Sequence, residues 1–513
     1  MLKIVRRILA TVFFAGVTLL FLDFTGTLHR GFGWMAKLQF IPAVLAVNVA
    51  VVLLLVALTL LFGRIYCSVI CPLGVFQDGV SNLSARRKGK KNRFRYSPAM
   101  SWLRYGVLAL FVVMLVAGVN VAVSLLDPYG VYGRMASNFL SPVYRLANNL
   151  LAWFSERVDS YVFYSTDVWI KGWITFGMAV VMFGVVGFLA WRNGRAYCNT
   201  VCPVGTMLGF LSRFSLFRMA FDTEKCTRCN ACERRCKSSC IDVKTMTIDH
   251  SRCVTCFNCI ERCKFGAMNY APVKWGRKRG EKPSSGQTPV SATVNTDSQN
   301  TMSRRNALSA ITFLAAGTVL KAQEQAVEVR GDGGLAEIMD KKNIARQTPI
   351  VPPGSMGARH MKQHCTACQL CVSACPNNIL RPSNKLATLM QPEMSYERGY
   401  CRPECVECSH VCPTGAIKPI SAADKSAIAI GLAVWVSDRC VVNTDGVQCH
   451  NCQRHCPTGA ITLVDRDPGY SDSLKVPVVD KELCIGCGAC ENLCPARPYS
   501  AIYVEGNVRH HQI

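Results

Sequence analysis

The chain has 513 residues, of which 50 % are hydrophobic, and a formal net charge of +25 at pH 7. This length suits several domains, and the longest apolar stretches lie near the start of the chain. The basic residues gather beside those stretches, in 3–7, 86–95 and 192–195, which indicates membrane flanks and argues against a nucleic-acid surface.

Four stretches without Asp, Glu, Lys, Arg or His predict membrane-spanning helices. They cover residues 8–22, 38–62, 105–126 and 172–191. A crossing needs about 20 apolar residues, and the first stretch reaches that length if Arg6 and Arg7 lie at the interface. It lacks a small-residue cleavage site, which favours an uncleaved helix over a signal peptide. The basic loops predict that the N-terminus, the loop after the second stretch and the chain after Trp191 face the cytoplasm.

Two similar motifs follow the second and fourth stretches. Each begins with Gly-Arg and contains Tyr-Cys-x3-Cys-Pro-x-Gly, which places Cys67 and Cys71 in one copy and Cys198 and Cys202 in the other. The repeat predicts two related helix pairs that meet at this level. Three functional roles stay open for the four thiols, namely ligation of another redox centre, electron relay or a docking surface. The alternative is a packing motif with inert thiols.

Six groups of four account for 24 of the 29 cysteines, and four of these tetrads keep the spacing C-x2-C-x2-C-x3-C. The regular tetrads are Cys226, Cys229, Cys232, Cys236; Cys253, Cys256, Cys259, Cys263; Cys365, Cys368, Cys371, Cys375; and Cys484, Cys487, Cys490, Cys494. The looser ones are Cys401, Cys405, Cys408, Cys412 and Cys440, Cys449, Cys452, Cys456.

This is the bacterial ferredoxin spacing, in which three thiolates of a tetrad bind one cluster and the fourth usually binds a neighbouring cluster. Structural zinc usually takes two separated C-x2-C pairs, and an odd number of cysteines does not suit a disulfide framework. The sequence therefore predicts six [4Fe–4S] clusters whose iron is held by these 24 cysteines. Cys240 lies outside every tetrad and is predicted to bind no iron.

The predicted fold class is an α-helical membrane bundle with four transmembrane helices, followed by α+β ferredoxin-like [4Fe–4S] domains. The bundle covers 1–222, and a two-cluster domain covers 223–272. In that domain we expect Cys263 to bind the cluster of the first tetrad and Cys236 to bind the cluster of the second. A four-cluster domain covers 323–513, with short β-type runs at 460–464 and 501–504. Nested and sequential pairing of its tetrads both satisfy the spacing.

The segment between the ferredoxin domains has two predicted parts. Residues 273–302 are polar and rich in Ser, Thr, Gly and Pro, which predicts a disordered linker. Residues 303–322 begin with Ser-Arg-Arg and continue into an uncharged stretch, which resembles a twin-arginine export signal or anchor. The alternative is a basic amphipathic linker helix.

Several cofactor motifs are absent from the sequence. It has no C-x2-C-H haem motif, no P-loop and no dinucleotide fingerprint preceded by a strand. His29 is the only histidine before residue 250, so no histidine pair in the bundle can hold a b-type haem. Electrons from the membrane part are therefore expected to reach iron–sulfur clusters or the four motif cysteines directly.

On these motifs the chain resembles the NapH and NapG iron–sulfur proteins of periplasmic nitrate reductase systems, joined in one chain. The NapH-like part is 1–272, with its two C-x3-C-P motifs, and the NapG-like part is 302–513, with its Ser-Arg-Arg start and four tetrads. The resemblance implies a quinol dehydrogenase component that feeds a periplasmic reductase. The Cys401–Cys405 spacing departs from the family, and C-x3-C-P modules also recur in NosR-type and CcoG-type proteins.

We therefore expect a bacterial inner-membrane (cytoplasmic-membrane) protein that oxidises quinol, with menaquinol the favoured substrate. Electrons would pass through six clusters to a soluble or membrane-attached reductase or cytochrome, with the first ferredoxin domain cytoplasmic and the last periplasmic. His29, Arg30 and Trp34 are candidates for the quinol site, with interfacial anchoring as the alternative. No catalytic residue is assigned. The rival functions are ferredoxin-fed electron transfer in the opposite direction and a redox maturation factor of the NosR or CcoG type.

Overall fold

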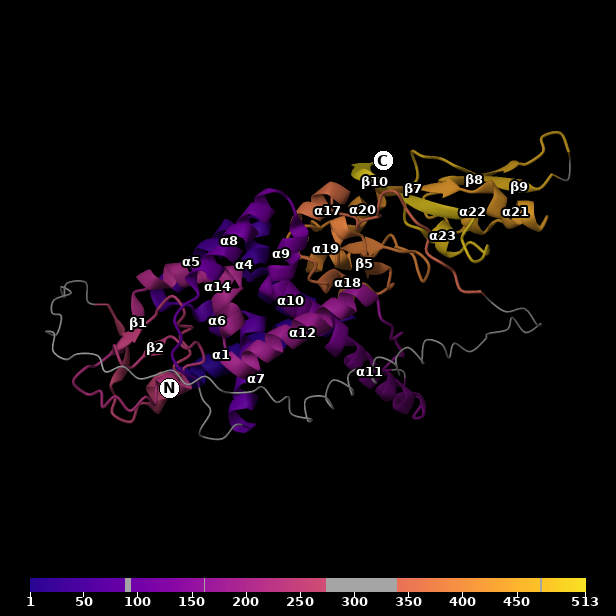
Figure 1. The fold of residues 1–513 in the computed structure, drawn as a ribbon. Helices are drawn as coiled ribbons and strands as arrows, with labels where there is room; N and C mark the ends of the chain where they lie inside the picture. The colour runs from indigo at the N-terminus through magenta and orange to yellow at the C-terminus, as the bar shows by residue number, and fades with distance from the viewer. Residues whose placement is uncertain (88–93, 161, 274–338, 471–472) are drawn as a thin grey trace, which may run out of the picture. The chain divides into compact units, whose positions relative to one another are not determined.

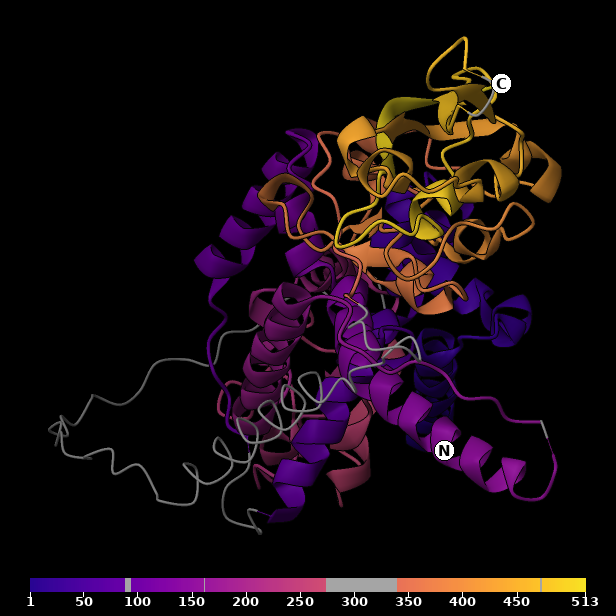
Figure 2. The same ribbon diagram turned by 90° about the vertical axis from the view of Figure 1, so that its right-hand side faces the viewer.

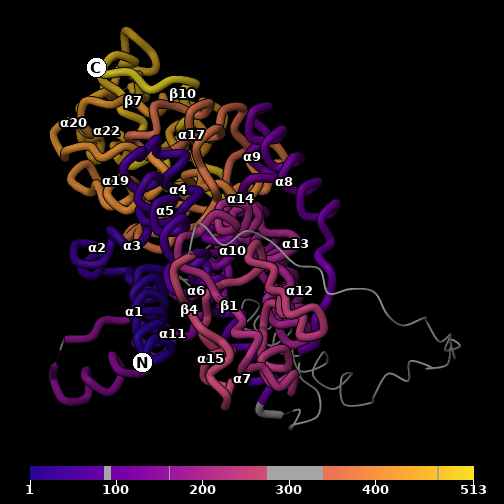
Figure 3. The backbone as a smooth tube through the Cα atoms, turned by 90° about the vertical axis from the view of Figure 1, so that its left-hand side faces the viewer, coloured from indigo at the N-terminus to yellow at the C-terminus, as the bar shows by residue number. Residues whose placement is uncertain are grey.

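A computed structural model describes residues 1–87, 94–160, 162–273, 339–470 and 473–513. The predicted linker and the twin-arginine-like segment lie outside these residues, except for Val273. Residues 1–273 and 341–513 pack together as one unit. Within it, helices α6, α10 and α14 lie between strand β1 of the first ferredoxin domain and helix α17 of the last (Figures 1 and 3).

The N-terminal part of the unit is a bundle of long and short helices. The longer helices are α1 (Leu2–Leu22), α5 (Val49–Phe62), α7 (Pro72–Arg87), α8 (Ser101–Val116), α11 (Ser141–Glu156) and α12 (Trp173–Asn193). The shorter ones are α2 (Thr27–Phe32), α3 (Trp34–Lys37), α4 (Phe40–Leu45), α6 (Ile65–Val69), α9 (Asn120–Leu126), α10 (Pro128–Met135), α13 (Ala196–Thr200) and α14 (Pro203–Leu211).

The prediction of four spans needs correction. Among the described residues, only α1 and α12, of 21 residues each, are long and apolar enough to cross a membrane. The stretch 38–62 is broken into α4 and α5, because Val47 adopts a left-handed φ of 53° and the Asn48 side chain caps α5 by accepting from the Val51 N–H. The stretch 105–126 is broken into α8 and α9 near Gly118, whose φ is 72°. A window of hydropathy does not register either break.

The first ferredoxin domain is closed by a strand pair from its two ends. Strand β1 (Phe217–Phe221) pairs antiparallel with β4 (Met268–Pro272), and β2 (Ile241–Asp242) pairs with β3 (Thr247–Ile248). Helix α15 (Asn258–Arg262) follows the second cysteine loop. The small core contains Met219, Ile241 and Met268 together with cysteine side chains, so the thiols and the apolar residues share one interior.

The last domain consists of short helices and three strand pairs. Its helices are α17 (Ala358–His364), α18 (Leu370–Ala374), α19 (Glu407–Val411), α20 (Ala422–Ser426), α21 (Val441–Thr444), α22 (Asn451–Arg454) and α23 (Ala489–Asn492). Its antiparallel pairs are β5 (Leu380–Pro382) with β6 (Pro392–Met394), β7 (Ile428–Trp435) with β10 (Ile502–Gln512), and β8 (Ile461–Asp465) with β9 (Lys475–Val479). The two β-type runs of the sequence fall in β8 and β10.

The two ferredoxin domains contact the bundle through separate residues. The Thr255 hydroxyl of the first domain donates to the Phe62 carbonyl at 3.3 Å, at the end of α5. The last domain packs on α9 and α10, where Arg134 Nη1 donates to the Ala367 carbonyl at 3.3 Å. The Ser137 and Ser373 hydroxyls are 3.1 Å apart at the same contact. Figure 2 shows the last domain, in orange and yellow, packed against the helices of the bundle.

A buried carboxylate, that of Asp78 in α7, joins four segments of the chain. It accepts from Arg195 Nε at 2.8 Å and from Arg6 at 3.1 and 3.3 Å, and the Lys237 ammonium lies 3.4 Å away. These four side chains are 0 to 8 % exposed. Burial raises the pKa of Asp78, but Arg195, Lys237 and Arg6 more than offset this, so the pKa lies well below its usual value.

We predict that Asp78→Asn destabilises the protein by about 3–5 kcal/mol, because three buried cations lose their only carboxylate among the described residues. Since folding lowers the pKa of Asp78, its stabilisation is present above the unfolded value of about 4 and is lost as the pH falls further. The measurement is the melting temperature in detergent. As a control, Asp222→Asn breaks an exposed pair with Lys225 and should change it little. Equal melting temperatures would contradict the prediction.

Candidate iron–sulfur centres

The four regular tetrads share one loop conformation. The residues on either side of the second cysteine have φ values between 51° and 79° in every copy, namely Arg228 and Asn230, Thr255 and Phe257, Ala367 and Gln369, and Gly486 and Gly488. Such left-handed residues turn successive backbone N–H groups toward one side of a loop and form a concavity that binds anions. A thiolate-bound iron–sulfur cluster is anionic, so the loop geometry fits this cofactor.

The two looser tetrads wind differently. The residue after their second cysteine is Val406 in one and His450 in the other, with φ of −121° and −122°. Neither adopts the left-handed conformation of the regular tetrads. The longer spacing before that cysteine thus comes with a second loop type, which the two looser tetrads share.

In the first ferredoxin domain the fourth cysteines exchange partners. Cys226, Cys229, Cys232 and Cys263 line one small cavity, which we name site A. Cys253, Cys256, Cys259 and Cys236 lie within electrostatic range of one another and form site B. This is the grouping that the spacing predicts.

Cys240 lies against site B. Its Sγ is 3.5 Å from that of Cys236, and the side chain is 1 % exposed. Hydrogen bonds to Cys236 and Cys253 raise the pKa of Cys240 well above its usual value, so it is a neutral thiol that donates to both sulfurs. That Cys240 binds no iron stays a prediction.

In the last domain the tetrads pair in sequence order. Site C contains Cys365, Cys368, Cys371 and Cys412, and site D contains Cys401, Cys405, Cys408 and Cys375. Site E contains Cys484, Cys487, Cys490 and Cys456, and site F contains Cys440, Cys449, Cys452 and Cys494. The Cys401 N–H donates to the Cys487 carbonyl at 2.9 Å, so sites D and E adjoin. Of the two pairings that the spacing allows, the structure has the sequential one.

The described part of the chain shows no site for a single metal ion. In the parts of the chain that the structure describes, no three His, Cys, Asp or Glu side chains converge closely enough to hold one metal ion. Four thiolates around a zinc ion would lie about 3.8 Å apart, as follows from a Zn–S bond of about 2.3 Å.

The two C-x3-C-P motifs are held together by arginines that cross between them. Arg64 Nη2 donates to the Cys198 carbonyl at 3.2 Å, and Arg195 Nη1 donates to the Cys67 carbonyl at 2.6 Å. A side chain at the last glycine of either motif would collide with the cysteine carbonyl that accepts one of these hydrogen bonds. A Cβ on Gly74 would lie 2.3 Å from the Cys67 carbonyl oxygen, and one on Gly205 would lie 2.1 Å from that of Cys198. The repeated Gly, Arg and Cys positions thus belong to one arrangement.

The exchange brings the four motif thiols together in the interior. Cys67, Cys71, Cys198 and Cys202 are 3 to 4 % exposed and lie within electrostatic range of one another. Gln77 Nε2 lies 3.1 Å from the Cys198 sulfur, Arg64 Nη2 lies 3.7 Å from that of Cys67, and the Gly205 N–H donates to that of Cys202 at 3.4 Å. Donors directed at sulfur suit thiolates, so this set, named the central thiols, fits a metal-bound centre.

The central thiols are connected to the ferredoxin sites on both sides. Arg64 Nη1 donates to the Ser251 carbonyl at 3.1 Å, two residues before Cys253 of site B. On the other side, Tyr197 lies within electrostatic range of Arg134, which contacts the loop between Cys365 and Cys368 of site C. The central thiols therefore lie between site B, reached through Arg64, and site C, reached through Tyr197 and Arg134.

The quinol-site candidates of the sequence separate in the structure. His29 Nδ1 is 3.0 Å from Asp23 Oδ2, and these side chains are 6 % and 2 % exposed. His29 Nε2 is buried without a hydrogen-bond partner among the described residues. Arg30 is exposed, and Trp34 packs edge-on against Phe13 with ring centroids 5.9 Å apart, so neither joins the pair.

Sequence reasoning missed Asp23. Burial raises its pKa, but hydrogen bonds from His29 and Thr25 lower it to about 2, so the carboxylate stays ionised beside the imidazole. The loop continues to Gly26, where a Cβ would lie 2.9 Å from Glu407 Oε2. Because Glu407 precedes Cys408, the loop that carries Asp23 and His29 lies against a residue next to a cysteine of site D. The available signal was an acid at the end of the first apolar stretch, six residues before the histidine.

The exchange of fourth cysteines predicts how iron is lost from double variants. Cys375→Ser with Cys408→Ser removes two ligands of site D and should cost about four iron atoms per chain. Cys375→Ser with Cys371→Ser removes ligands from one sequence tetrad but from two sites, C and D, and should cost about eight. Iron and sulfide analysis of the purified proteins measures this. The same loss from both variants would contradict the grouping.

Comparisons with known proteins agree with iron–sulfur binding. Residues 44–91 and 174–222 match a family model described as a 4Fe-4S binding domain, and residues 447–497 match a 4Fe-4S dicluster domain. The first two segments contain the central thiols, and the third contains cysteines of sites E and F. No solved structure matches the chain.

The curated relatives are ferredoxin-type proteins. The methylamine utilization ferredoxin-type protein MauM of Methylophilus methylotrophus is 32 % identical over 165 residues, 31 % of this chain and 71 % of that protein. The ferredoxin-type protein NapG of Escherichia coli is 33 % identical over 184 residues, 32 % of this chain and 77 % of that protein. The ferredoxin-type protein NapF of Escherichia coli is 30 % identical over 158 residues, 31 % of this chain and 87 % of that protein.

The expected resemblance to NapG is therefore confirmed. With cysteine loops shaped for anionic clusters and relatives of this kind, the chain belongs to the ferredoxin-type iron–sulfur proteins related to NapG and MauM, which makes it an iron–sulfur electron-transfer protein.

Proposed function

We propose that this protein is a membrane-bound quinol dehydrogenase component that passes electrons through its iron–sulfur sites to a periplasmic reductase or cytochrome. The observation that carries the proposal is the buried Asp23–His29 pair beside site D. Oxidation of a quinol releases two electrons and two protons. His29 would accept one proton and the second proton would pass to solvent, while sites D and C would each take one of the two electrons.

The geometry of His29 suits a proton acceptor. The Asp23 carboxylate beside Nδ1 favours the neutral tautomer with its hydrogen on that nitrogen. Nε2 then carries a lone pair, and among the described residues it has no partner. A quinol hydroxyl at Nε2 would donate its hydrogen bond there and lose its proton to the ring as the electrons leave. Asp23, with its lowered pKa, stabilises the imidazolium that forms.

Exposed apolar side chains support a membrane location in the bacterial inner membrane. They occur on α1 (Ile8, Val12), α5 (Leu53, Leu54), α8 (Val113, Val116) and α12 (Val181, Phe188). Apolar surface on several neighbouring helices is typical of a lipid-facing belt. The positive loop charge supports a cytoplasmic first ferredoxin domain. Because the last domain contacts α9 and α10 instead of the cytoplasmic helix ends, we place it on the periplasmic side.

We further propose that the six sites hold [4Fe–4S] clusters and that the central thiols hold a seventh redox centre. Arg64 supports the latter, because its guanidinium is fully buried and makes no ion pair with a carboxylate of the described residues. A buried charge is costly unless an opposite charge compensates it. Thiolates bound to a metal would supply that charge, and such a centre would join sites B and C.

Quinol oxidation is tested by adding menadiol anaerobically to the purified protein in detergent and following cluster reduction by EPR. We expect His29→Gln to slow this reduction about a hundredfold, the typical contribution of one acid–base group, while dithionite still reduces every cluster. His511→Gln, at an exposed position of β10, is the matched control and should keep the wild-type rate. Unchanged reduction by menadiol in His29→Gln would remove this residue from the mechanism.

The seventh centre is tested by iron content. Wild-type protein should exceed the roughly 24 iron atoms of six cubanes, and replacing all four central cysteines by Ser should remove only the excess. The variant should also keep sites A and B oxidised when menadiol reduces the last domain, because the connection between them is lost. Identical iron contents in the two proteins would exclude ligation and leave the thiols a packing role.

A second candidate is ferredoxin-fed electron transfer in the opposite direction. Site A favours it, because Cys229 is exposed and Cys226 and Cys263 are half-buried, which gives a soluble donor direct access. In that case the clusters would stay oxidised with menadiol and become reduced by a low-potential ferredoxin.

A further inference from the structure

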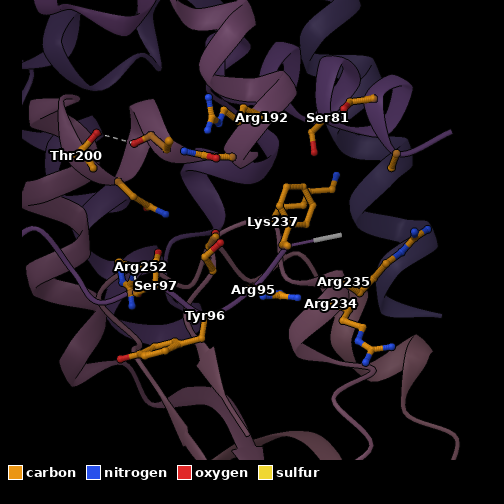
Figure 4. A pocket seen from close by; sticks show the side chains of 18 of the residues that line it. Ser81, Arg95, Tyr96, Ser97, Arg192, Thr200, Arg234, Arg235, Lys237 and Arg252 are labelled. Carbon is orange, nitrogen blue, oxygen red and sulfur yellow. Dashed lines mark hydrogen bonds between the residues drawn. The ribbon is translucent and has the colours of Figure 1, made fainter. Parts of the chain in front are cut away.

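A cavity of about 640 Å³ lies between the bundle and the first ferredoxin domain and has no part in the electron path described above. Its walls come from α7, from the end of α12, from residues 94–100 and from the ferredoxin residues around Lys237. Figure 4 shows Ser81 and Arg192 across the cavity from Arg95 and Arg234. The volume lies within the range of about 300–1,000 Å³ that is typical of small-molecule sites.

The charge of the lining is one-sided. Among the described residues, six basic side chains line the cavity and no acidic side chain does. Lys237 is paired with Asp78, and Arg252 is paired with Asp249. Of the other lining arginines, Arg95, Arg192 and Arg234 make no ion pair with an acid of the described residues. Guanidinium groups without a counter-ion on the walls of one cavity suit an anion with several acceptor oxygens.

Two buried hydroxyls point to the same chemistry. Ser81 and Ser238 line the cavity and are 2 % and 6 % exposed. Neither Oγ has a hydrogen-bond partner among the described residues. Buried hydroxyls are normally satisfied, and a phosphate oxygen in the cavity would accept from them as it does from the arginines.

We propose that this cavity binds a phosphate-bearing molecule whose phosphate oxygens pair with arginines of the cavity wall, Arg95 and Arg192 among them. The cavity is larger than one phosphate, and Phe94, Tyr96 and Trp191 line it as well, so the ligand has a less polar body. Two sources share this chemistry, a soluble phosphorylated cofactor such as a flavin nucleotide and the headgroup of an anionic phospholipid. Lys237 directly follows Cys236 and Asn258 directly precedes Cys259, which places the bound molecule beside site B.

Binding is tested by calorimetry on the cluster-loaded protein in detergent, with inorganic pyrophosphate as the probe. The test variant is Arg95→Gln with Arg192→Gln, both at exposed positions. The matched control is Arg262→Gln with Lys264→Gln, which removes the same charge from exposed positions of the first ferredoxin domain outside the cavity. We expect the test variant to bind pyrophosphate at least about tenfold more weakly, the value of one charge-assisted hydrogen bond, and the control to bind as wild type.

Equally weakened pyrophosphate binding in both variants would show that net charge explains the effect, and would overturn the proposal. Failure of the wild type to bind pyrophosphate would overturn it as well. Iron content and reduction by menadiol are measured in the same proteins, so failure here is separate from failure of the proposed function. Competition of flavin mononucleotide with pyrophosphate supports the proposal and assigns the soluble source. Phosphatidylglycerol that co-purifies with wild type and control, but not with the test variant, supports it and assigns the lipid source.

Discussion

The exchange of two buried arginines between the halves of the bundle is the interaction on which the interior of this protein depends. Arg64 and Arg195 each donate to a cysteine carbonyl of the opposite motif. Their charges are compensated differently, since Arg195 has the carboxylate of Asp78, whereas Arg64 has only carbonyl, amide and sulfur partners among the described residues. That asymmetry is what the bundle would need if thiolates on a metal supplied the missing negative charge.

A second constraint comes from the exchange of fourth cysteines. Each site takes three thiols from one tetrad and one from its partner tetrad, so neither site of a pair can be completed without the other. The small apolar core of the first domain includes the cysteines themselves. Its stability therefore depends on the bound clusters, as in small metal-containing domains generally.

The spacing of the cysteines was sufficient to predict the cysteine loops, but it did not predict the residues that surround them. Regular spacing predicts the grouping in the first domain because only two tetrads are present to pair. With four tetrads the spacing leaves two pairings, and the position of Cys412 beside Cys365 and Cys371 belongs to the sequential one. Asp78 carries no local signal, because its partners Arg6, Arg195 and Lys237 come from distant parts of the chain. The helix breaks near Val47 and Gly118 were not predicted either, because hydropathy measures how apolar a segment is and not its backbone conformation.

The burial of the sites varies along the sequence of contacts in a way that suits electron transfer between partners. Site A includes the exposed Cys229, whereas Cys365, Cys368 and Cys371 of site C are buried where the last domain meets α10. In site F, Cys449 and Cys452 are half-buried, Cys440 and Cys494 are buried, and a cavity adjoins all four. Exposure at site A permits exchange with a soluble protein, and burial of site C prevents loss of electrons to solvent oxidants. The loop of the Asp23–His29 pair lies against Glu407, which precedes Cys408 of site D. A quinol bound there would donate electrons between the two ends of the series of sites. The relative potentials of sites C and D would decide which end receives the electrons.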